Sequence, residues 1–494
     1  MADKSADVII VGAGNAAFCA ALAAQEHGAE VLMLEAAPEE ESGGNSRFTA
    51  GSIRVVYNGV DDIKTLVPDL TPAEIESTDF GTYTAAQFFD DMARVTQHRA
   101  DPDLVELLVT RSFATLDWMR EKGLRFIPIY GRQAFKVDGK FKFWGGLTVE
   151  AVGGGPGLVG MLTAAARKRG IAIHYRTRAL DLLFDGSRVE GVRTRGDDGV
   201  KELRAKSVVL ACGGFEANAA WRTRYLGPGW DLAKVRGSRF NTGDGIRMAL
   251  AIGASPYGNW SGCHAVQWEM NAPEFGDLAV GDQFQKHSYP FGILINALGK
   301  RFVDEGADFR NYTYAKYGRV VLEQPGQFAW QIFDQKVKHL QRDEYRIRQI
   351  TRVTANSIDE FAQRLDGVNA AEFLKTVSEW NKAVRVDVPF NPNIKDGRGT
   401  SGLAVDKSNW ANTIDTPPFE GYAVTCGVTF TFGGLRINNE AQVLNTDYGP
   451  IRGLYAAGEL VGGLFYFNYP GGTGLMSGAV FGKIAGASAG SAPA

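Results

Sequence analysis

The sequence predicts an α/β protein that begins with a Rossmann-like strand–helix–strand unit, and three observations support this fold class. Asp7–Val11 is a short apolar run suited to a strand buried on both faces of a parallel sheet. Gly12 and Gly14 follow with the spacing of a tight turn that lets the backbone approach phosphate. A second apolar run, Glu30–Leu34, ends at Glu35, where a carboxylate would bind ribose hydroxyls. The unit is therefore predicted to bind a dinucleotide.

The segment between these strands predicts a helix over Asn15–His27. It is rich in alanine, a strong helix former, and Gly28 is suited to end it in a left-handed conformation. Ala17 takes the third small position of the motif, where helix and strand lie close. The N–H groups and the positive dipole end at the helix start favour phosphate. The alternative is an ordinary strand–helix–strand unit without a ligand.

Length and composition indicate a globular protein of more than one domain. The chain has 494 residues, which exceeds the usual size of a single core. Hydrophobic residues make up 45% and charged residues 22%, values typical of globular proteins. The formal net charge of -3 gives no electrostatic reason to expect a nucleic-acid partner.

The cysteines and the hydropathy pattern predict a cytoplasmic protein. Cys19, Cys212, Cys263 and Cys426 are far apart and lack the spacing of iron–sulfur or other metal ligands, so no metal site is expected. They are expected to be reduced. We expect neither a signal peptide nor a membrane span, because no apolar run reaches the roughly 18 residues that a bilayer requires.

Three further glycine-rich segments favour a long cofactor over nicotinamide alone. Glu41–Ser52 (ESGGNSRFTAGS) is too polar for another strand–helix unit and is predicted to be a loop laid along an extended ligand. Ser207–Asn218 (SVVLACGGFEAN) is an apolar strand running into a Gly-Gly turn, and a polar hairpin is expected before it, around Val189–Glu202. Gly453–Gly463 repeats the pattern of strand and turn and adds Glu459. Segments this distant in the sequence can contact one extended cofactor.

These motifs, with NTGDG at Asn241–Gly245, resemble in order the soluble fumarate reductase and succinate dehydrogenase flavoprotein family, the FAD-dependent oxidoreductase 2 family. The chain is most similar to its tricarballylate dehydrogenase-like branch, through GGNS, RFVDEGADF, TFTFGGL and PPFEGYA. The resemblance covers nearly the whole chain. It implies FAD, a Rossmann-like FAD-binding domain of the glutathione-reductase type, and an inserted α+β substrate-capping domain. We place the FAD-binding domain at residues 1–264 and 416–494 and the capping domain at 265–415.

The resemblance also implies how FAD is held. Covalently flavinylated relatives carry a histidine where this chain has Asn45–Phe48, so attachment is expected to be noncovalent. Gly471–Met476 would open the last helix, whose positive end could stabilise reduced flavin. The residues expected to bind FAD are Gly12, Gly14, Asn15, Ala16, Glu35, Ala36, Gly43, Gly44, Asn45, Ser46, Ala50, Gly51, Ala179, Ala211, Gly213, Asn241, Gly243, Asp244, Gly458, Glu459, Gly472, Gly474 and Leu475.

In this family a hydride moves between flavin N5 and carbon while a proton moves on the neighbouring carbon. Arg310, which ends RFVDEGADFR, resembles the family's proton shuttle with one extra residue before it. The alternative is a structural ion pair with Asp308 or Glu305, since arginine is normally charged. His264 is similar to a substrate-binding histidine, and its alternative role is that of a core histidine.

Two positions depart from the fumarate reductases. Phe430, followed by Thr431, replaces a histidine, and Tyr469 replaces an arginine that grips a carboxylate. The candidate catalytic residues are therefore Arg310, Tyr469, His264, Phe430 and Thr431. Loss of charge-assisted contacts worth about 1.5–3 kcal/mol each would weaken binding of a second carboxylate. A less charged or aromatic-sided substrate is therefore expected.

The segment NYPGGTG around Tyr469 also resembles 3-ketosteroid dehydrogenases. Other rings could lie near it, although aromatic clusters are often plain core: Tyr289, Tyr312, Tyr314, Phe465, Tyr466 and Phe467. The leading prediction is an FAD-dependent dehydrogenase or reductase acting on a CH–CH or C=C bond beside a carboxylate or carbonyl, tricarballylate dehydrogenase-like. The alternatives are a ketosteroid-type, enone or aromatic-acid desaturase and a nonredox flavin-dependent isomerase or hydratase.

The electron partner of a redox enzyme is not written in the sequence. The single dinucleotide motif is assigned to FAD, and no second nicotinamide motif is found. A quinone-linked partner, an iron–sulfur partner or oxygen is therefore expected before NAD.

Elsewhere, Ala85–Lys122 predicts helices that start at Asp101-Pro102 and stop at Gly123, and Ser357–Val384 predicts two amphipathic helices of the cap.

Overall fold

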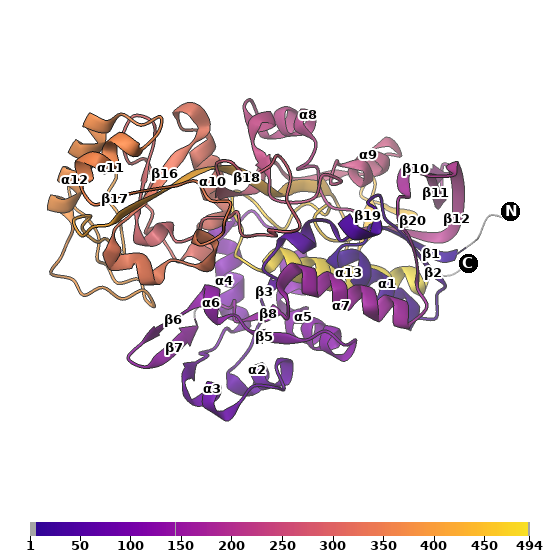
Figure 1. Ribbon diagram of the computed structural model, residues 1–494. Coiled ribbons are helices and arrows are strands. Elements are labelled where there is room, and N and C mark those ends of the chain that lie inside the picture. Colours follow the sequence, from indigo (N-terminus) through magenta and orange to yellow (C-terminus); the bar gives the residue numbers. More distant parts are fainter. Residues whose placement is uncertain (1–5, 144, 493–494) are drawn as a thin grey trace.

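The computed structural model describes residues 6–143 and 145–492. Two lobes lie side by side, and the described ends of the chain both lie in the lobe on the right of Figure 1. The other lobe contains the middle of the chain, including helices α11 (Ile358–Arg364) and α12 (Ala370–Ala383). These two helices confirm the pair predicted over Ser357–Val384. A third group of short elements, drawn in purple, packs below.

The larger lobe is built on a mixed sheet of eight strands in the described part of the chain. Its order is β10-β11-β12-β1-β2-β9, with β20 also paired to β12 and β19 to β20. The strands are β1 (Ala6–Val11), β2 (Val31–Leu34), β9 (Ala172–His174), β10 (Arg178–Phe184), β11 (Val189–Gly196), β12 (Gly199–Leu210), β19 (Gln442–Leu444) and β20 (Pro450–Ala456). β1 pairs in parallel with β2 and β12, so the carboxyl ends of all three meet at one edge of the sheet. β11 and β12 form the predicted polar hairpin.

The first strand–helix–strand unit lies within a residue or two of its predicted bounds. β1 is followed by α1 (Asn15–Glu26), and Gly28 beyond it has the predicted left-handed conformation, with φ 84°. The last helix, α13 (Thr473–Gly490), packs along α1. A Cβ on Gly482 would lie 2.5 Å from the carbonyl oxygen of Ala16, so glycine is required for this close approach. The two ends of the sequence are thereby joined beneath the sheet.

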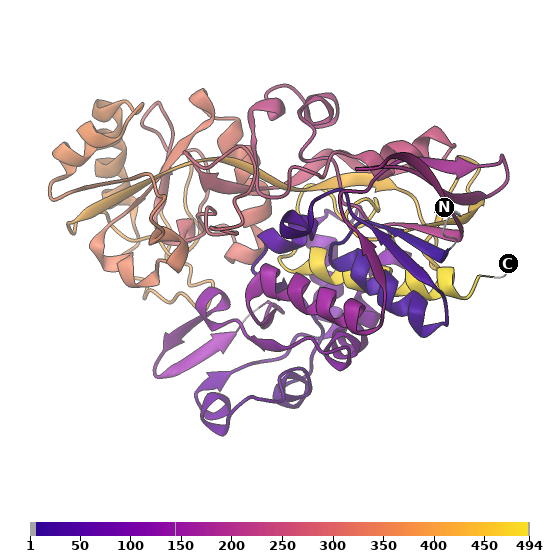
Figure 2. The ribbon, with the colours of Figure 1, turned by 45° about the vertical axis from the view of Figure 1, so that its right-hand side comes forward.

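The second lobe is organised by two long strands, β14 (Pro256–Glu269) and β18 (Phe419–Leu435). They pair with each other along both lobes, as the views in Figures 1 and 2 show for β18. The remaining strands of this sheet are β13 (Lys234–Val235), β15 (Ile293–Ile295), β16 (Ala329–Phe333) and β17 (Arg352–Ala355). The predicted boundary at residues 264 and 265 falls inside β14, so the division into domains stays a prediction.

The lower group contains two small sheets and several helices. The Asp101 side chain accepts hydrogen bonds from the N–H groups of Asp103 and Leu104 and caps the start of α5 (Pro102–Glu121), as predicted. Gly123 follows the helix with φ 105°. The strands are β3 (Ser52–Ile53), β4 (Thr78–Asp79), β5 (Phe126–Pro128), β6 (Ala134–Val137), β7 (Lys140–Phe143) and β8 (Val149–Ala151). The remaining helices of the molecule are α2 (Val60–Leu66), α3 (Pro72–Glu76), α4 (Ala85–Val95), α5 (Pro102–Glu121), α6 (Tyr130–Gln133), α7 (Gly154–Lys168), α8 (Ala219–Trp221), α9 (Asp244–Ala251) and α10 (Tyr314–Leu322).

One predicted loop is partly regular. Within Glu41–Ser52, residues Gly44–Phe48 form a short 3₁₀ helix and Ser52 begins β3. Every helix in residues 6–143 and 145–492 is too short or too polar to cross a membrane. The same residues contain no group of three or more His, Cys, Asp or Glu side chains placed to hold a metal ion.

Candidate active site

A long cavity of roughly 1550 Å³, including its open mouth, runs from the carboxyl edge of the main sheet toward the second lobe. Glu35 and Ala179 line it at the sheet edge, and Gly44 and Gly458 lie along it. Arg310 also lines it, from the segment that precedes α10. One cavity therefore connects the glycine turns of the nucleotide unit with the candidate catalytic residues.

The turn between β1 and α1 leaves room for a ligand because of its glycines. Gly12 has φ 118°, and a Cβ there would lie 2.3 Å from the carbonyl oxygen of Ala211. Gly14 is the N-cap of α1 and, being glycine, supplies no capping side chain. The N–H of Asn15 donates to Ser46 Oγ at 3.0 Å. A helix start of this kind offers N–H groups and a positive dipole end to phosphate.

Glu35 lies at the end of β2 and is 7% exposed. Its Oε1 accepts the N–H of Ala37 at 2.8 Å. Burial raises the pKa of Glu35 above its ordinary value, and hydrogen bonds from backbone N–H groups offset part of this effect. The position and its hydrogen-bonding capacity fit the role predicted for it, the binding of ribose hydroxyls.

A polar layer borders the cavity. Asn45, Asn241 and Glu459 line it, whereas the fully buried Glu216 does not. Glu216 Oε1 accepts hydrogen bonds from Asn45 Nδ2 at 2.5 Å and from Asn241 Nδ2 at 2.6 Å. Glu459 Oε1 accepts the backbone N–H of Thr431 at 2.7 Å. Burial raises the pKa of both Glu216 and Glu459, and for Glu216 the neighbouring Glu459 raises it further. Two neighbouring carboxyl groups, those of Glu216 and Glu459, are thus buried beside the cavity.

The start of α13 lies on the opposite side of this layer. Gly472 is its N-cap with φ 81°, and no side chain caps the helix. A Cβ on Gly472 would lie 2.3 Å from Leu147 Cδ1 and 2.9 Å from the backbone nitrogen of Arg54. Gly472, Gly474 and Leu475 all line the cavity, so a second uncapped helix start is presented to it.

The structure brings nearly all of the predicted cofactor residues to the cavity, with three exceptions. Gly43 faces Arg47 and Val159, Gly51 packs against Gly154, and Gly243 packs against Trp221. These glycines shape the turns without lining the cavity. The predicted residues that do line it are Gly12, Gly14, Asn15, Ala16, Glu35, Ala36, Gly44, Asn45, Ser46, Ala50, Ala179, Ala211, Gly213, Asn241, Asp244, Gly458, Glu459, Gly472, Gly474 and Leu475.

At the other end, a histidine and two tyrosines form one cluster. The hydroxyl groups of Tyr314 and Tyr469 are 2.9 Å apart, and either can be the donor. The ring of His264 lies 4.8 Å from that of Tyr314 and 4.7 Å from that of Tyr469, measured between centroids. All three line the cavity. Burial, followed by the interaction with Tyr314, raises the pKa of Tyr469, so this phenol stays protonated.

His264 has no hydrogen-bond partner on either ring nitrogen, although it is only 1% exposed. Burial and then Arg236 hold its pKa well below the ordinary value, so the ring is neutral. A neutral imidazole can donate from one nitrogen and accept at the other. Buried polar atoms normally have partners, so both ring nitrogens are available to a ligand that enters this end of the cavity.

Arg310 is 9% exposed and its side chain does not form the predicted ion pair. Asp308 contacts Arg94 at 2.5 Å, and Glu305 contacts Arg301 at 2.6 Å. Neither carboxylate lines the cavity. Arg310 instead donates from Nη2 to the carbonyl oxygen of Arg132 at 3.1 Å, and its Nη1 lies 3.4 Å from Nδ1 of His287. Burial lowers the pKa of Arg310, and its Nε has no partner.

Two further arginines line the cavity, and no motif in the sequence marked them. Arg132 from α6 contacts Asp282 at 3.0 Å, and Arg236 contacts the same carboxylate at 3.8 Å. With Arg310 they bring three guanidinium groups to the cavity. The expectation of a weakly charged site rested on Phe430, Tyr469 and the neighbouring aromatic residues, whereas the structure supplies cations from other segments. Arg236 lies five residues before Asn241 of NTGDG, which is the one signal that could have drawn attention to it.

Phe430 lines the cavity and stacks near Tyr469, with ring centroids 6.2 Å apart. Thr431 does not line it. It is 0% exposed, and its Oγ1 accepts the N–H of Phe215 at 3.3 Å and lies 3.1 Å from Glu459 Oε1. Thr431 therefore holds Glu459 in place. Of the other predicted rings only that of Tyr314 reaches the cavity; the rest do not line it: Tyr289, Tyr312, Phe465, Tyr466 and Phe467.

The mixed sheet, its glycine turns and the cavity that ends in cations and phenols define a dinucleotide-dependent oxidoreductase. A family model described as "FAD binding domain" matches residues 7–475, and the chain therefore belongs to this family. A probable fumarate reductase of Shewanella frigidimarina is 28% identical over 489 residues, which cover 98% of this chain and 74% of that protein. A 3-oxosteroid 1-dehydrogenase of Mycolicibacterium smegmatis is 26% identical over 566 residues, covering 98% and 97%.

Comparison with solved structures gives the same result. The open conformation of a flavocytochrome c3 fumarate reductase matches with a TM-score of 0.73 and 28% identity, over 99% of this chain and 78% of that one. The predicted fold class and cofactor are confirmed: the chain is an FAD-dependent oxidoreductase that acts on CH–CH groups. Its own residues fit FAD, because two helix starts with glycine at the N-cap and a buried carboxylate, Glu35, line one cavity.

Proposed function

We propose that the enzyme transfers a hydride between FAD and a CH–CH or C=C bond next to a carboxylate, and that tricarballylate-type polycarboxylates are its substrates. The observation that supports this proposal is the excess of positive charge at the end of the cavity. Arg132 and Arg236 share Asp282, and Arg310 forms no ion pair with a carboxylate among the described residues. Glu344 acts on Arg310 only from beyond ion-pair distance, and a buried cation with no carboxylate in contact is costly, so an anionic ligand would stabilise this arrangement.

When bound, FAD would supply the hydride acceptor or donor. Arg132 and Arg236 would orient a substrate carboxylate, since guanidinium groups bind carboxylates with fixed geometry. Arg310 would move the proton on the neighbouring carbon, because burial already lowers its pKa and so reduces the cost of its neutral form. His264, neutral and unpaired, would hydrogen-bond to the substrate.

Arg236→Met tests the carboxylate contact, and we expect it to raise KM for the carboxylate substrate by about tenfold or more. A charge-assisted hydrogen bond contributes about 1.5–3 kcal/mol. Arg239→Met is the matched control, because Arg239 pairs with Glu41 at 2.9 Å at the surface. Steady-state kinetics with tricarballylate and with fumarate would measure the change. Equal KM values for both variants and the wild type would contradict this assignment.

A second candidate function is supported by the tyrosine pair. The contact between the hydroxyls of Tyr314 and Tyr469 allows one phenol to donate to a carbonyl while the other supports it. Phe430 adds an aromatic wall beside Tyr469. This arrangement favours an enone or an aromatic acid. Anaerobic bleaching of the flavin by ketones or aryl acids, with none by tricarballylate, succinate or fumarate, would replace the first candidate by the second.

We propose that FAD is noncovalent, because no histidine occupies Asn45–Phe48. Acid precipitation of the holoenzyme would then leave the flavin in solution, whereas a yellow pellet would show a covalent bond.

We further propose a quinone-linked or iron–sulfur partner, or oxygen, as the electron partner before NAD, and the cytoplasm as the location. Rapid flavin reduction by NADH would contradict the proposed electron partner, and export of the native protein would contradict the cytoplasmic location.

A further inference from the structure

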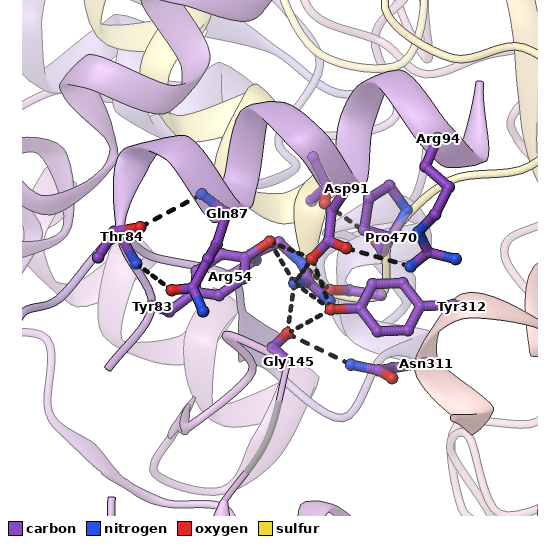
Figure 3. A network of polar contacts seen from close by, with 12 residues as sticks. Arg54, Tyr83, Thr84, Gln87, Asp91, Arg94, Gly145, Asn311, Tyr312 and Pro470 are labelled. Atoms are coloured by element: carbon purple, nitrogen blue, oxygen red, sulfur yellow. Dashed lines mark hydrogen bonds and ion pairs between the residues drawn. The ribbon is translucent and has the colours of Figure 1, made fainter. Parts of the chain in front are cut away.

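A buried arginine outside the cavity connects several distant segments. Arg54 follows β3 and is 0% exposed. Its Nε donates to the carbonyl oxygen of Gly471 at 2.9 Å, and its Nη1 donates to Tyr83 Oη at 2.8 Å and to the carbonyl oxygen of Gly145. Asp91 on α4 lies 3.6 Å from Nη1. Figure 3 shows these groups gathered around the guanidinium.

The hydrogen bonds of Arg54 fix the direction of the turn that opens α13. Its backbone N–H donates to the carbonyl oxygen of Gly472 at 3.2 Å, and its Nε binds the preceding carbonyl, that of Gly471. In a trans peptide, the C=O and the next N–H point in opposite directions. The N–H of Gly472 is therefore directed away from Arg54, and Gly472 lines the cavity. Arg54 thus orients an N–H group at the FAD site without touching that site.

The same cluster reaches the substrate end of the cavity through Tyr312. The Tyr312 hydroxyl donates to Asp91 at 2.6 Å and lies 3.4 Å from Nη1 of Arg54. Tyr312 belongs to the short 3₁₀ helix Arg310–Tyr312, so it is two residues from the candidate proton carrier. Asn468 Nδ2 donates to the carbonyl oxygen of Tyr312 at 2.7 Å, and Asn468 precedes Tyr469. Arg54 is thus bonded to both segments that carry candidate catalytic side chains.

The charge of Arg54 is retained inside the protein. Burial alone would lower its pKa, but Tyr83, Tyr312 and Asp91 together raise it above the ordinary value. The counter-ion Asp91 lies nearer the surface, with 16% of its side chain exposed, and it is shared with Arg94 at 3.1 Å. Arg54, the cation of this cluster, is fully buried and lies at the start of α13, which is the positive end of the helix dipole. Both charges favour a negative ligand nearby, because the interior screens them weakly.

We propose that Arg54 is a positioning residue that holds the Gly471–Gly472 turn and the Arg310–Tyr312 helix in register, and that its buried charge raises the reduction potential of bound FAD. The reduction potential can be measured whenever FAD is bound, whatever the substrate is. The expected effect on kcat rests on the proposed function as well, so the potential and kcat are measured separately.

The test uses the holoenzyme carrying Arg54→Met, Arg54→Lys or Arg94→Met. We expect Arg54→Met to lower the midpoint potential and to reduce kcat by about tenfold to a hundredfold, since small misplacements of reacting groups cost rates of this size. Arg54→Lys keeps the charge but cannot donate in a planar fork, so it should restore the potential and leave kcat low. Arg94→Met removes a cation that contacts Asp91 but not Gly471, and it should leave the potential unchanged.

Anaerobic titration against a reference dye gives the potential without any substrate, so a wrong substrate assignment would not affect it. An unchanged potential and kcat in Arg54→Met would overturn the proposal, and so would equal shifts in Arg54→Met and Arg94→Met. Recovery of kcat by Arg54→Lys would overturn the positioning role. If Arg54→Met fails to fold, Arg54→Lys decides alone: a potential near that of the wild type with low kcat supports the proposal, and any other result overturns it.

Discussion

Arg310→Met is expected to lower kcat by about 10²- to 10⁴-fold while FAD remains bound, the range typical for loss of a positioned proton carrier. Methionine fills a similar space without a proton to give or a charge. Arg310 lines the substrate end of the cavity, and its hydrogen bond is to Arg132, which is not among the residues expected to bind FAD. Single-turnover flavin reduction or oxidation by substrate measures the effect directly.

Arg310→Lys is the control for this prediction. It keeps a cation but loses the hydrogen bond to the Arg132 carbonyl oxygen, and it should recover little activity. The flavin-to-protein ratio and the melting temperature show whether each variant is intact. A loss of kcat smaller than about tenfold in Arg310→Met would assign proton transfer to the Tyr314–Tyr469 pair instead, because a proton carrier normally contributes more than this.

Gly12→Ala is expected to yield protein without stoichiometric FAD. The added Cβ would lie 2.3 Å from the Ala211 carbonyl oxygen, and both residues directly follow paired parallel strands, where the backbone is held by the sheet. The residue also has φ 118°, which side-chain-bearing residues rarely adopt. The turn must therefore move away from the phosphate position. The flavin absorbance of the purified variant, compared with its protein content, checks this outcome.

Gly28→Ala separates the two causes. Gly28 also has a positive φ, 84°, but a Cβ there meets no atom within 4 Å. We expect only a loss of about 1 kcal/mol of stability from the backbone conformation, with FAD binding intact. Full FAD occupancy in Gly12→Ala would show that the turn tolerates the clash, and the role given to this glycine would be wrong.

The nucleotide half of the site could be predicted because its signals are local. A strand, a turn and a helix within about thirty residues determine where Gly12, Gly14 and Glu35 lie relative to one another, since the βαβ unit has one geometry. The glycine turns after β12 and β20 were predictable for the same reason, because parallel strands end at the same edge of the sheet. The confirmed fold and cofactor follow from these short-range patterns.

The substrate half could be predicted only in part, because long-range packing decides it. His264 and Tyr469 were recognised by motif, but Arg132 comes from a short helix in the lower group, and its role depends on how that group packs. Charges next to each other in sequence were also misleading. Asp308 is two residues from Arg310, yet it binds Arg94 from another helix. Sequence spacing does not show which face of an irregular segment a side chain takes.

The paired strands β14 and β18 have a mechanical consequence for substrate entry. They cross between the lobes as one hydrogen-bonded ribbon, so the lobes are not joined by slack linkers. Such a ribbon bends most easily where its ladder is interrupted. The interruptions lie between Gly258 and Cys263 and again between His264 and Ala265. We therefore expect any opening of the lobes to rotate His264 relative to Tyr469, which would couple substrate entry to assembly of the site.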